Sequence, residues 1–149
     1  ALPISQEGVK KVLKSQKAQV FLFPSTGTGG WETALTNTLS PGDTVLAARN
    51  GMFSLRWIDM CQRHALDVTI VETPWGEGIP ADRFEETLTA DRGHEIRVVL
   101  ATHNETATGV KSDIAAVRRA LELSASAMII VHNHPTTPSM ITFDHAEYR

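Results

Sequence analysis

Residues 96–101 read IRVVLA and residues 102–109 continue as THNETATG, so that an apolar run passes directly into a dense polar loop. Other short apolar runs share this character and lie at residues 20–23, 44–48, 68–71 and 127–131. They are rich in β-branched residues and mostly uninterrupted, which is typical of strands buried on both faces of a parallel sheet.

Stretches with helical spacing separate these runs. We expect helices at residues 8–16, 31–39, 53–66, 81–90 and 112–121, the last with Ser112 or Asp113 as its N-cap. The alternation of strand and helix predicts right-handed crossovers. The fold class is therefore α/β, a doubly wound and mostly parallel sheet with flanking helices.

Composition excludes several classes of protein. The 149 residues carry 14 Lys and Arg against 17 Asp and Glu, a net charge of −3, and 42% are hydrophobic. This balance offers no basic stripe for nucleic acid. No apolar run approaches the roughly 18 residues of a membrane-spanning helix. The single Cys61 forms no intrachain disulfide and favours a reducing compartment, so we expect a cytoplasmic protein.

Ligands of open α/β sheets bind beyond the carboxyl ends of the strands, where this chain has three suggestive loops. Residues 24–30, PSTGTGG, combine glycines and hydroxyls before a helix, which suits an anion, although such a loop can also be a simple turn. At residues 50–53 an Asn-Gly turn precedes Phe53, which could cover a flat ring or belong to the core. The polar loop 102–109 predicts a ligand-binding loop. Alternatively, its hydroxyls only cap a helix and stabilise turns.

A fourth loop carries two histidines. His132 and His134 stand two residues apart after a strand and can point the same way toward a metal, with Asp144 or His145 as a further ligand. Two ligands alone do not make a catalytic zinc site.

Three stretches together resemble the class V, fold-type I aminotransferases that use pyridoxal phosphate, especially the serine–glyoxylate and alanine–glyoxylate enzymes. They are residues 21–32, 34–43 and 102–110, and the resemblance spans about residues 8–121. It implies that residues 8–149 are part of the cofactor-binding large domain, with the assignment of residues 122–149 left open. Apart from the resemblance, we expect residues 1–7 to be non-native or disordered.

The resemblance also assigns roles. Thr26, Gly27 and Thr28 would hold the cofactor phosphate, Phe53 would cover the pyridine, and Thr106 would reach the phenolic oxygen. Asn133 falls where the family has an Asp that pairs with the pyridinium nitrogen. The Schiff-base lysine falls beyond Arg149, so no catalytic residue is expected in the chain, which would be inactive alone.

The resemblance implies two substrates, an amino acid (serine or alanine) and the 2-oxo acid glyoxylate. It also implies that the full-length protein is a homodimer. Two alternatives stay open at this point. Residues 122–135 also resemble the His-x-His-Pro segment of RadC-like JAB/MPN modules, which would bind a metal through His132, His134 and Asp144. The chain could also be a folded fragment without catalysis, with an exposed sheet edge that promotes aggregation.

Overall fold

The structure is a computed structural model that describes residues 2–12, 14, 17, 19–20, 24–122, 127–134 and 137–145. Helices and strands alternate through most of this part of the chain, as predicted, and a short hairpin and a last strand are added to the pattern. The elements are α1 (Leu2–Val12), α2 (Gly27–Thr38), β1 (Thr44–Arg49), α3 (Met52–Arg63), β2 (Asp67–Glu72), α4 (Ala81–Ala90), β3 (Ile96–Thr102), β4 (Asn104–Glu105), β5 (Val110–Lys111), α5 (Ile114–Leu121), β6 (Ala127–His134) and β7 (Thr137–His145).

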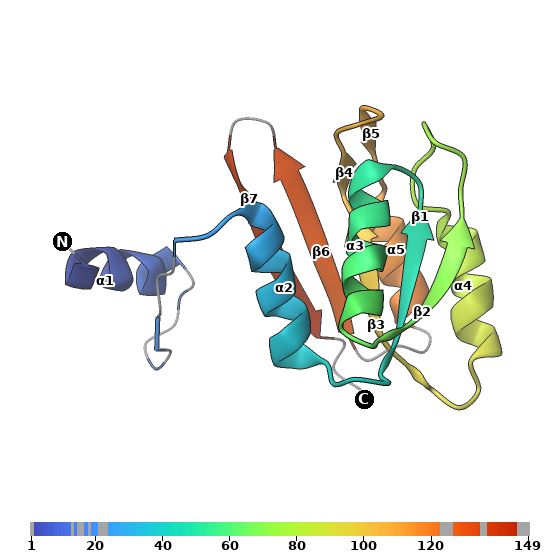
Figure 1. The fold of residues 1–149 in the computed structure, drawn as a ribbon, viewed down its shortest axis with the longest axis horizontal. Coiled ribbons are helices and arrows are strands. Elements are labelled where there is room, and N and C mark those ends of the chain that lie inside the picture. Colours follow the sequence, from blue (N-terminus) through green and yellow to red (C-terminus); the bar gives the residue numbers. More distant parts are fainter. Residues whose placement is uncertain are drawn as a thin grey trace.

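A five-stranded sheet forms the centre of the molecule, in the order β2-β1-β3-β6-β7 (Figure 1). The pairs β1–β2, β1–β3 and β3–β6 are parallel, and β7 runs antiparallel to β6. The predicted α/β class with a mostly parallel sheet is thus confirmed.

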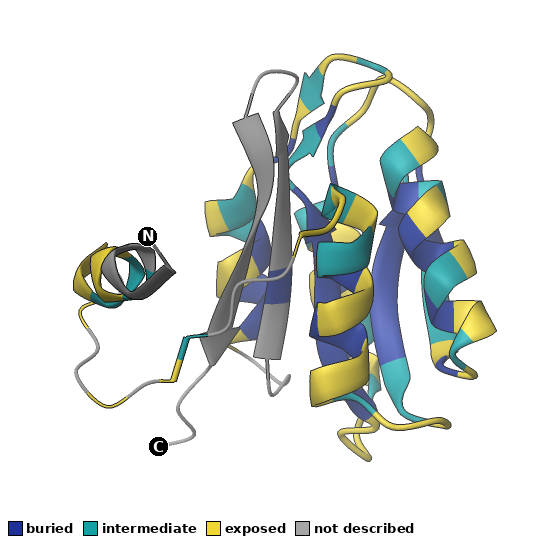
Figure 2. Ribbon diagram, turned by 60° about the vertical axis from the view of Figure 1, so that its left-hand side comes forward, coloured by how far each residue is buried: buried dark blue, intermediate teal, exposed yellow. Residues whose placement is uncertain are grey.

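The uninterrupted apolar runs follow from burial on both faces of the sheet. In β1, Val45 and Ala47 belong to the core beneath α2 and α3, whereas Leu46 and Ala48 belong to the core beneath α4 and α5. Figure 2 shows the buried strand between helices whose outer sides are exposed. Because both cores need apolar side chains, successive strand residues cannot alternate with polar ones.

Helix boundaries differ from the prediction where a cap or a turn decides them. Helix α4 has the predicted bounds, and α5 begins after Asp113, whose side chain accepts a hydrogen bond from Ala116 N at 3.0 Å. Helix α3 ends at Arg63 rather than at residue 66, because Ala65 is left-handed (φ 56°) and Leu66 N donates back to Cys61 O at 3.0 Å. Helix α1 covers Leu2–Val12 instead of residues 8–16.

Three strands were not predicted, and one predicted strand lies mostly outside the described residues. The loop after β3 contains the antiparallel pair β4–β5. Strand β7 has no uninterrupted apolar run and contains Pro138, which is tolerated because β7 lies at the sheet edge. The strand expected at residues 20–23 lies mostly outside the described residues, since 21–23 are not among them.

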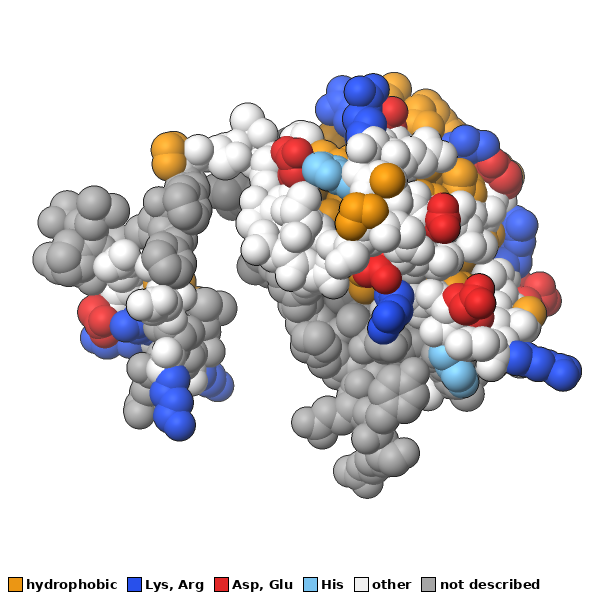
Figure 3. Space-filling view, turned by 60° about the horizontal axis from the view of Figure 1, so that its bottom comes forward, with side chains coloured by type: hydrophobic (Ala, Val, Ile, Leu, Met, Phe, Trp, Pro, Cys, Tyr) orange, Lys and Arg blue, Asp and Glu red, His pale blue; other side chains and the backbone are white. Residues whose placement is uncertain are grey.

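The surface carries mixed charge. On the face that Figure 3 brings forward, near the end of the sheet opposite the loops discussed below, Lys and Arg side chains are interspersed with Asp and Glu. Among the described residues, none of the helices is both long and apolar enough to cross a membrane.

Candidate functional site

Three of the loops suggested by the sequence meet at one edge of the sheet. Helices α2 and α3 begin at this edge, and the β4–β5 hairpin lies there too (Figure 1). The rings of Trp31 in α2 and Phe53 in α3 meet edge to face, with 6.1 Å between their centroids. Phe53 N in turn donates to the Glu105 carboxylate at 3.0 Å. The helix that follows the first loop thus contacts the start of α3, and α3 contacts the polar loop after β3.

The first loop is the beginning of helix α2. Thr26 has extended backbone, its Oγ1 accepts from Gly29 N at 3.3 Å, and its carbonyl accepts from Gly30 N at 3.1 Å. The helix thus starts at Gly27, four residues earlier than predicted, because Thr26 caps it. The amides of Gly27 and Thr28 are first-turn donors without a helical carbonyl. With the exposed hydroxyls of Thr26 and Thr28, they suit an anion.

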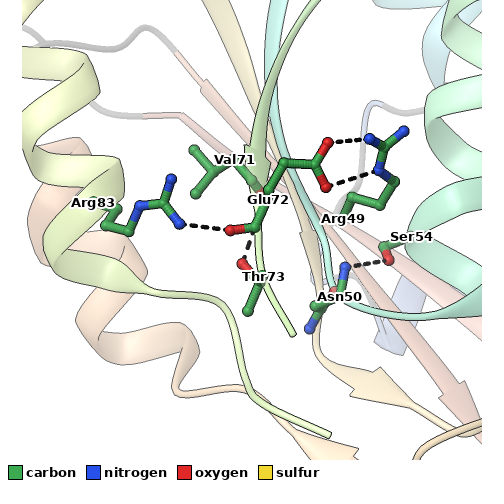
Figure 4. Close-up of polar contacts among 7 residues, drawn as sticks. All are labelled: Arg49, Asn50, Ser54, Val71, Glu72, Thr73 and Arg83. Atoms are coloured by element: carbon green, nitrogen blue, oxygen red, sulfur yellow. Dashed lines mark hydrogen bonds and ion pairs between the residues drawn. The ribbon is translucent and has the colours of Figure 1, made fainter. Parts of the chain in front are cut away.

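The second loop carries the chain from β1 into α3 through a tight polar turn. Ser54 Oγ accepts from Asn50 N at 3.0 Å (Figure 4). It also accepts from Gly51 N at 2.9 Å and donates to Gly51 O at 2.9 Å. Asn50 Nδ2 also donates to Glu77 O at 3.1 Å, which holds the loop after β2. The chain bends at Gly51, and these hydrogen bonds fix where α3 starts.

Phe53 occupies the first turn of α3 and is half-buried. Trp31 meets it edge-on, and Trp31 in turn packs on Trp57 with 5.1 Å between ring centroids. The guanidinium of Arg56 lies 5.7 Å from the centre of the Phe53 ring and makes a cation–π contact. The core and ligand-cover alternatives for Phe53 are thus not exclusive, since the ring is supported by core indoles and is still partly exposed.

Glu105 is the residue of this edge that sequence reasoning did not single out. It is fully buried, and its carboxylate accepts hydrogen bonds from Phe53 N and from Ser54 N, the latter at 3.1 Å. A Cβ on Gly51 would overlap the Glu105 side chain, so glycine allows the close approach. Thr106 follows directly and is exposed. The only sequence signal was an acidic residue inside a polar loop.

Ion pairing fixes the neighbouring strand ends. Arg49 and Glu72 are partners in the β1–β2 register and form a bidentate ion pair, with 3.0 Å from Nε to Oε2. Arg83 donates to the Glu72 carbonyl (Figure 4). The hydrogen bond and the charge of Glu72 raise the pKa of Arg49. This pair ties β2 to β1 beside the Asn50 turn.

The fourth loop continues strand β6. Thr102, the last residue of β3, pairs with Val131, so residues 132–134 extend past the end of β3 toward the edge that carries Thr106. Asn133, His132 and His134 lie on β6 and Asp144 on β7, but their side chains are outside the described residues. Among the side chains that are described, no three His, Cys, Asp or Glu residues gather as a metal site.

A cleft of about 420 Å³ lies beside this edge, at the start of α5. His103, Lys111 and Ser112 line it together with the first residues of α5. Ser112 is buried and accepts a hydrogen bond from Ile79 N at 3.2 Å, which anchors the loop after β2 a second time.

Comparison with known proteins identifies the family. The class-V aminotransferase family model matches residues 4–140, and the chain belongs to this family. The match includes β6, so the metal-binding JAB/MPN alternative, which required residues 122–135 to belong to a separate module, is not supported.

Two of the similar curated proteins are glyoxylate aminotransferases. The chain is 90% identical over 116 residues to an L-aspartate–glyoxylate aminotransferase of Paracoccus denitrificans, over 78% of this chain and 29% of that protein. It is 48% identical over 125 residues to a serine–glyoxylate aminotransferase of Hyphomicrobium methylovorum, over 84% of this chain and 31% of that protein. The chain thus spans about a third of these relatives.

Solved structures show the same fold. The alanine–glyoxylate aminotransferase of Nostoc sp. superimposes with a TM-score of 0.66 at 21% identity, covering 95% of this chain and 44% of that one. For the pyridoxamine–pyruvate aminotransferase of Mesorhizobium loti the TM-score is 0.70 at 19% identity, covering 95% and 42%.

Proposed function

We propose that this chain forms the phosphate-binding and ring-binding part of the pyridoxal phosphate site of a glyoxylate aminotransferase. One observation carries the proposal. The Trp31–Phe53 ring contact and the hydrogen bond from Phe53 N to Glu105 bring the α2 N-terminus, the Phe53 ring and the loop of Thr106 to one edge of the sheet. In this proposal the α2 N-terminus binds an anion, the Phe53 ring packs on a flat ring, and Thr106 donates a hydroxyl hydrogen bond.

The described residues fit the phosphate end of the cofactor. The start of α2 offers the amides of Gly27 and Thr28 and the exposed hydroxyls of Thr26 and Thr28, and the positive end of the helix dipole favours a dianion. Thr26 and Thr28 donate hydroxyl hydrogen bonds to phosphate oxygens in this proposal, and Gly27 lets the backbone approach closely.

The residues around the ring follow from the same edge. Phe53 packs on the pyridine and limits access of water, and Thr106 donates its hydroxyl to the phenolic oxygen. Asn133, on the part of β6 beyond Thr102, hydrogen-bonds the ring nitrogen, where a neutral amide holds positive charge less well than a carboxylate. When bound, pyridoxal phosphate supplies the electron sink that makes amino-group transfer possible.

The proposal assigns no nucleophilic lysine to this chain. Lys111 lies at the start of the cleft beside α5 and is exposed, and Lys10, Lys11, Lys14 and Lys17 belong to or follow α1. We therefore expect the chain alone to bind the cofactor without transferring amino groups.

The substrate classes come from the similar proteins. Glyoxylate is in the names of both curated relatives described above, and we propose it as the amino acceptor. The relative at 90% identity adds L-aspartate to the serine and alanine that the sequence implied, and its closeness favours L-aspartate as donor. Assay of the complete enzyme with glyoxylate and each donor decides among the three.

We also propose that the protein is cytoplasmic, which the single cysteine supports. We propose further that it is a homodimer, which the family resemblance supports. Sedimentation of the complete enzyme tests the dimer, because a monomer at micromolar concentration would contradict it.

A titration with pyridoxal phosphate tests the cofactor site. Trp75 is 56% exposed, so a Trp75→Phe background leaves the emission of the buried Trp31 and Trp57 as the reporter beside the site. We expect saturable quenching by pyridoxal phosphate and much weaker quenching by pyridoxal, which lacks the phosphate. Thr26→Ala with Thr28→Ala should weaken the binding of pyridoxal phosphate about a hundredfold, since two hydrogen bonds to a charged group are lost.

Thr36 supplies the matched control. It is also an exposed threonine of α2, but its hydroxyl donates to Glu32 O at 2.8 Å, two turns from the N-terminus of the helix. Thr36→Ala should bind pyridoxal phosphate like the parent chain. Equal binding of pyridoxal and pyridoxal phosphate would contradict the proposal, as would unchanged affinity in the double Thr26/Thr28 variant.

A further inference from the structure

The inference concerns Glu105, a fully buried carboxylate in the loop between β3 and α5. Its Oε2 accepts from Phe53 N at 3.0 Å and from Ser54 N at 3.1 Å, across a sequence separation of 52 and 51 residues. These amides belong to the first turn of α3, which has no helical carbonyl for them. Gly51, at the N-cap position, has no side chain that could serve them.

The local alternatives are already engaged. Ser54 turns its hydroxyl back to Asn50 and Gly51, and so does not cap the amides of its own turn. A carboxylate from another segment therefore replaces a local cap, and its negative charge lies at the positive end of α3. The close fit against Gly51 leaves the Glu105 side chain no room to shift toward that backbone.

We propose that Glu105 is a positioning residue that sets the Phe53 ring relative to the hydroxyl of Thr106. Glu105 bonds the main chain of the ring residue, and its own peptide leads directly into Thr106. One side chain thus links the ring cover and the hydroxyl donor that the proposed function assigns, and the inference rests on that assignment. Glu105 itself is fully buried, so in this proposal it acts on the site through Phe53 and Thr106.

Gly51 provides an independent way to displace the carboxylate. Its φ of 171° is extended backbone that any residue adopts, so alanine is not strained there. The added Cβ would instead overlap the Glu105 side chain and push it away from α3. Gly51→Ala should therefore reproduce the effects of Glu105→Ala. Glu105→Gln can keep one oxygen in the Oε2 position and should retain part of the function.

Amide hydrogen exchange without cofactor tests the positioning by itself. We expect the Phe53 and Ser54 amides to exchange about tenfold faster in Glu105→Ala and Gly51→Ala, because each amide loses a hydrogen bond to a charged acceptor. Glu105→Gln should lie between these and the parent chain. Ser112→Ala is the matched control, since it removes another buried acceptor, for Ile79 N, on the same side of the molecule. It should leave both amides unchanged.

Cofactor binding tests the consequence. The induced circular dichroism of bound pyridoxal phosphate reports how the ring is held, and it should weaken in Glu105→Ala and Gly51→Ala, recover in part in Glu105→Gln, and persist in Ser112→Ala. Unchanged exchange at Phe53 and Ser54 in Glu105→Ala would overturn the inference. Equal losses of dichroism in Ser112→Ala would also overturn it, because they would show a general loss of structure. If the parent chain binds no pyridoxal phosphate, the proposed function fails, while the exchange measurement still decides whether Glu105 positions α3.

Discussion

Trp31 offers a sharp test of how the site is supported by the core. The side chain is 2% exposed and contacts Phe53 and Trp57, yet its Nε1 has no hydrogen-bond partner among the described residues. Two substitutions separate these properties. Trp31→Ala removes the packing and the unpaired donor together, whereas Trp31→Phe keeps a ring in place and removes the donor.

The two expected magnitudes differ widely. Trp31→Ala should cost about 3–5 kcal/mol, as for other large-to-small core changes. For a chain of this length that corresponds to a fall in Tm on the order of 10 °C. In Trp31→Phe, the lost packing of roughly 1–2 kcal/mol is offset by the removal of a buried unpaired N–H, which costs about 1–3 kcal/mol. The net change should stay within about 1 kcal/mol.

Urea unfolding followed by circular dichroism measures both values. Trp57→Phe is a parallel case, because Trp57 is also 2% exposed and its Nε1 is also without a partner among the described residues. Trp75→Phe is the exposed control and should change stability by less than about 0.5 kcal/mol. A Trp31→Phe variant as unstable as Trp31→Ala would refute the reasoning, since it would show that the indole N–H is satisfied in the folded chain.

Three further predictions concern titration, capping and surface charge. Burial raises the pKa of the Cys61 thiol from 9.0 to about 12, so its contribution to stability is complete below pH 9 and is lost as the pH rises toward 12. Cys61→Ala should therefore lose less stability than the parent chain across that interval in thermal melts. Asp113→Ala should destabilise by about 1 kcal/mol in urea, through loss of the α5 cap, whereas Asp113→Asn should cost much less. Glu72→Gln should cost under about 1 kcal/mol at low salt, and raising the salt should shrink the difference, because the pair with Arg49 is exposed.

The layered core was predictable because each of its parallel strands, β1, β2, β3 and β6, carries its own apolar run. The run at residues 44–48 must satisfy a core on either face, and this requirement appears directly as uninterrupted apolar sequence. Helix caps such as Asp113 were predictable because the capping side chain lies next to the helix in the sequence. The start of α2 was predicted too late because glycines count against a helix by propensity, although the Thr26 cap decides the boundary here.

The loops of the candidate site were predicted, but the bonds that join them were not. Nothing near Glu105 in the sequence distinguishes its carboxylate from the neighbouring polar groups, and its partners lie about 50 residues earlier. Strand β7 was missed because its pairing with β6, rather than its own composition, makes it a strand. The first failure concerns a contact between segments about 50 residues apart, and the second concerns pairing within a hairpin. Periodicity and capping rules describe neither.

The bond between Glu105 and α3 also constrains how the site can form. A buried carboxylate needs partners, and the amides of Phe53 and Ser54 need an acceptor, so neither segment is satisfied without the other. The bond from Phe53 N to Glu105 can form only when the loop after β3 lies beside the start of α3, as it does with β3 paired to β1. Substitutions in that loop should consequently disturb the ring on α3 as strongly as substitutions within α3 itself. In this edge of the sheet, the ring cover and the hydroxyl donor of the proposed site form one structural unit.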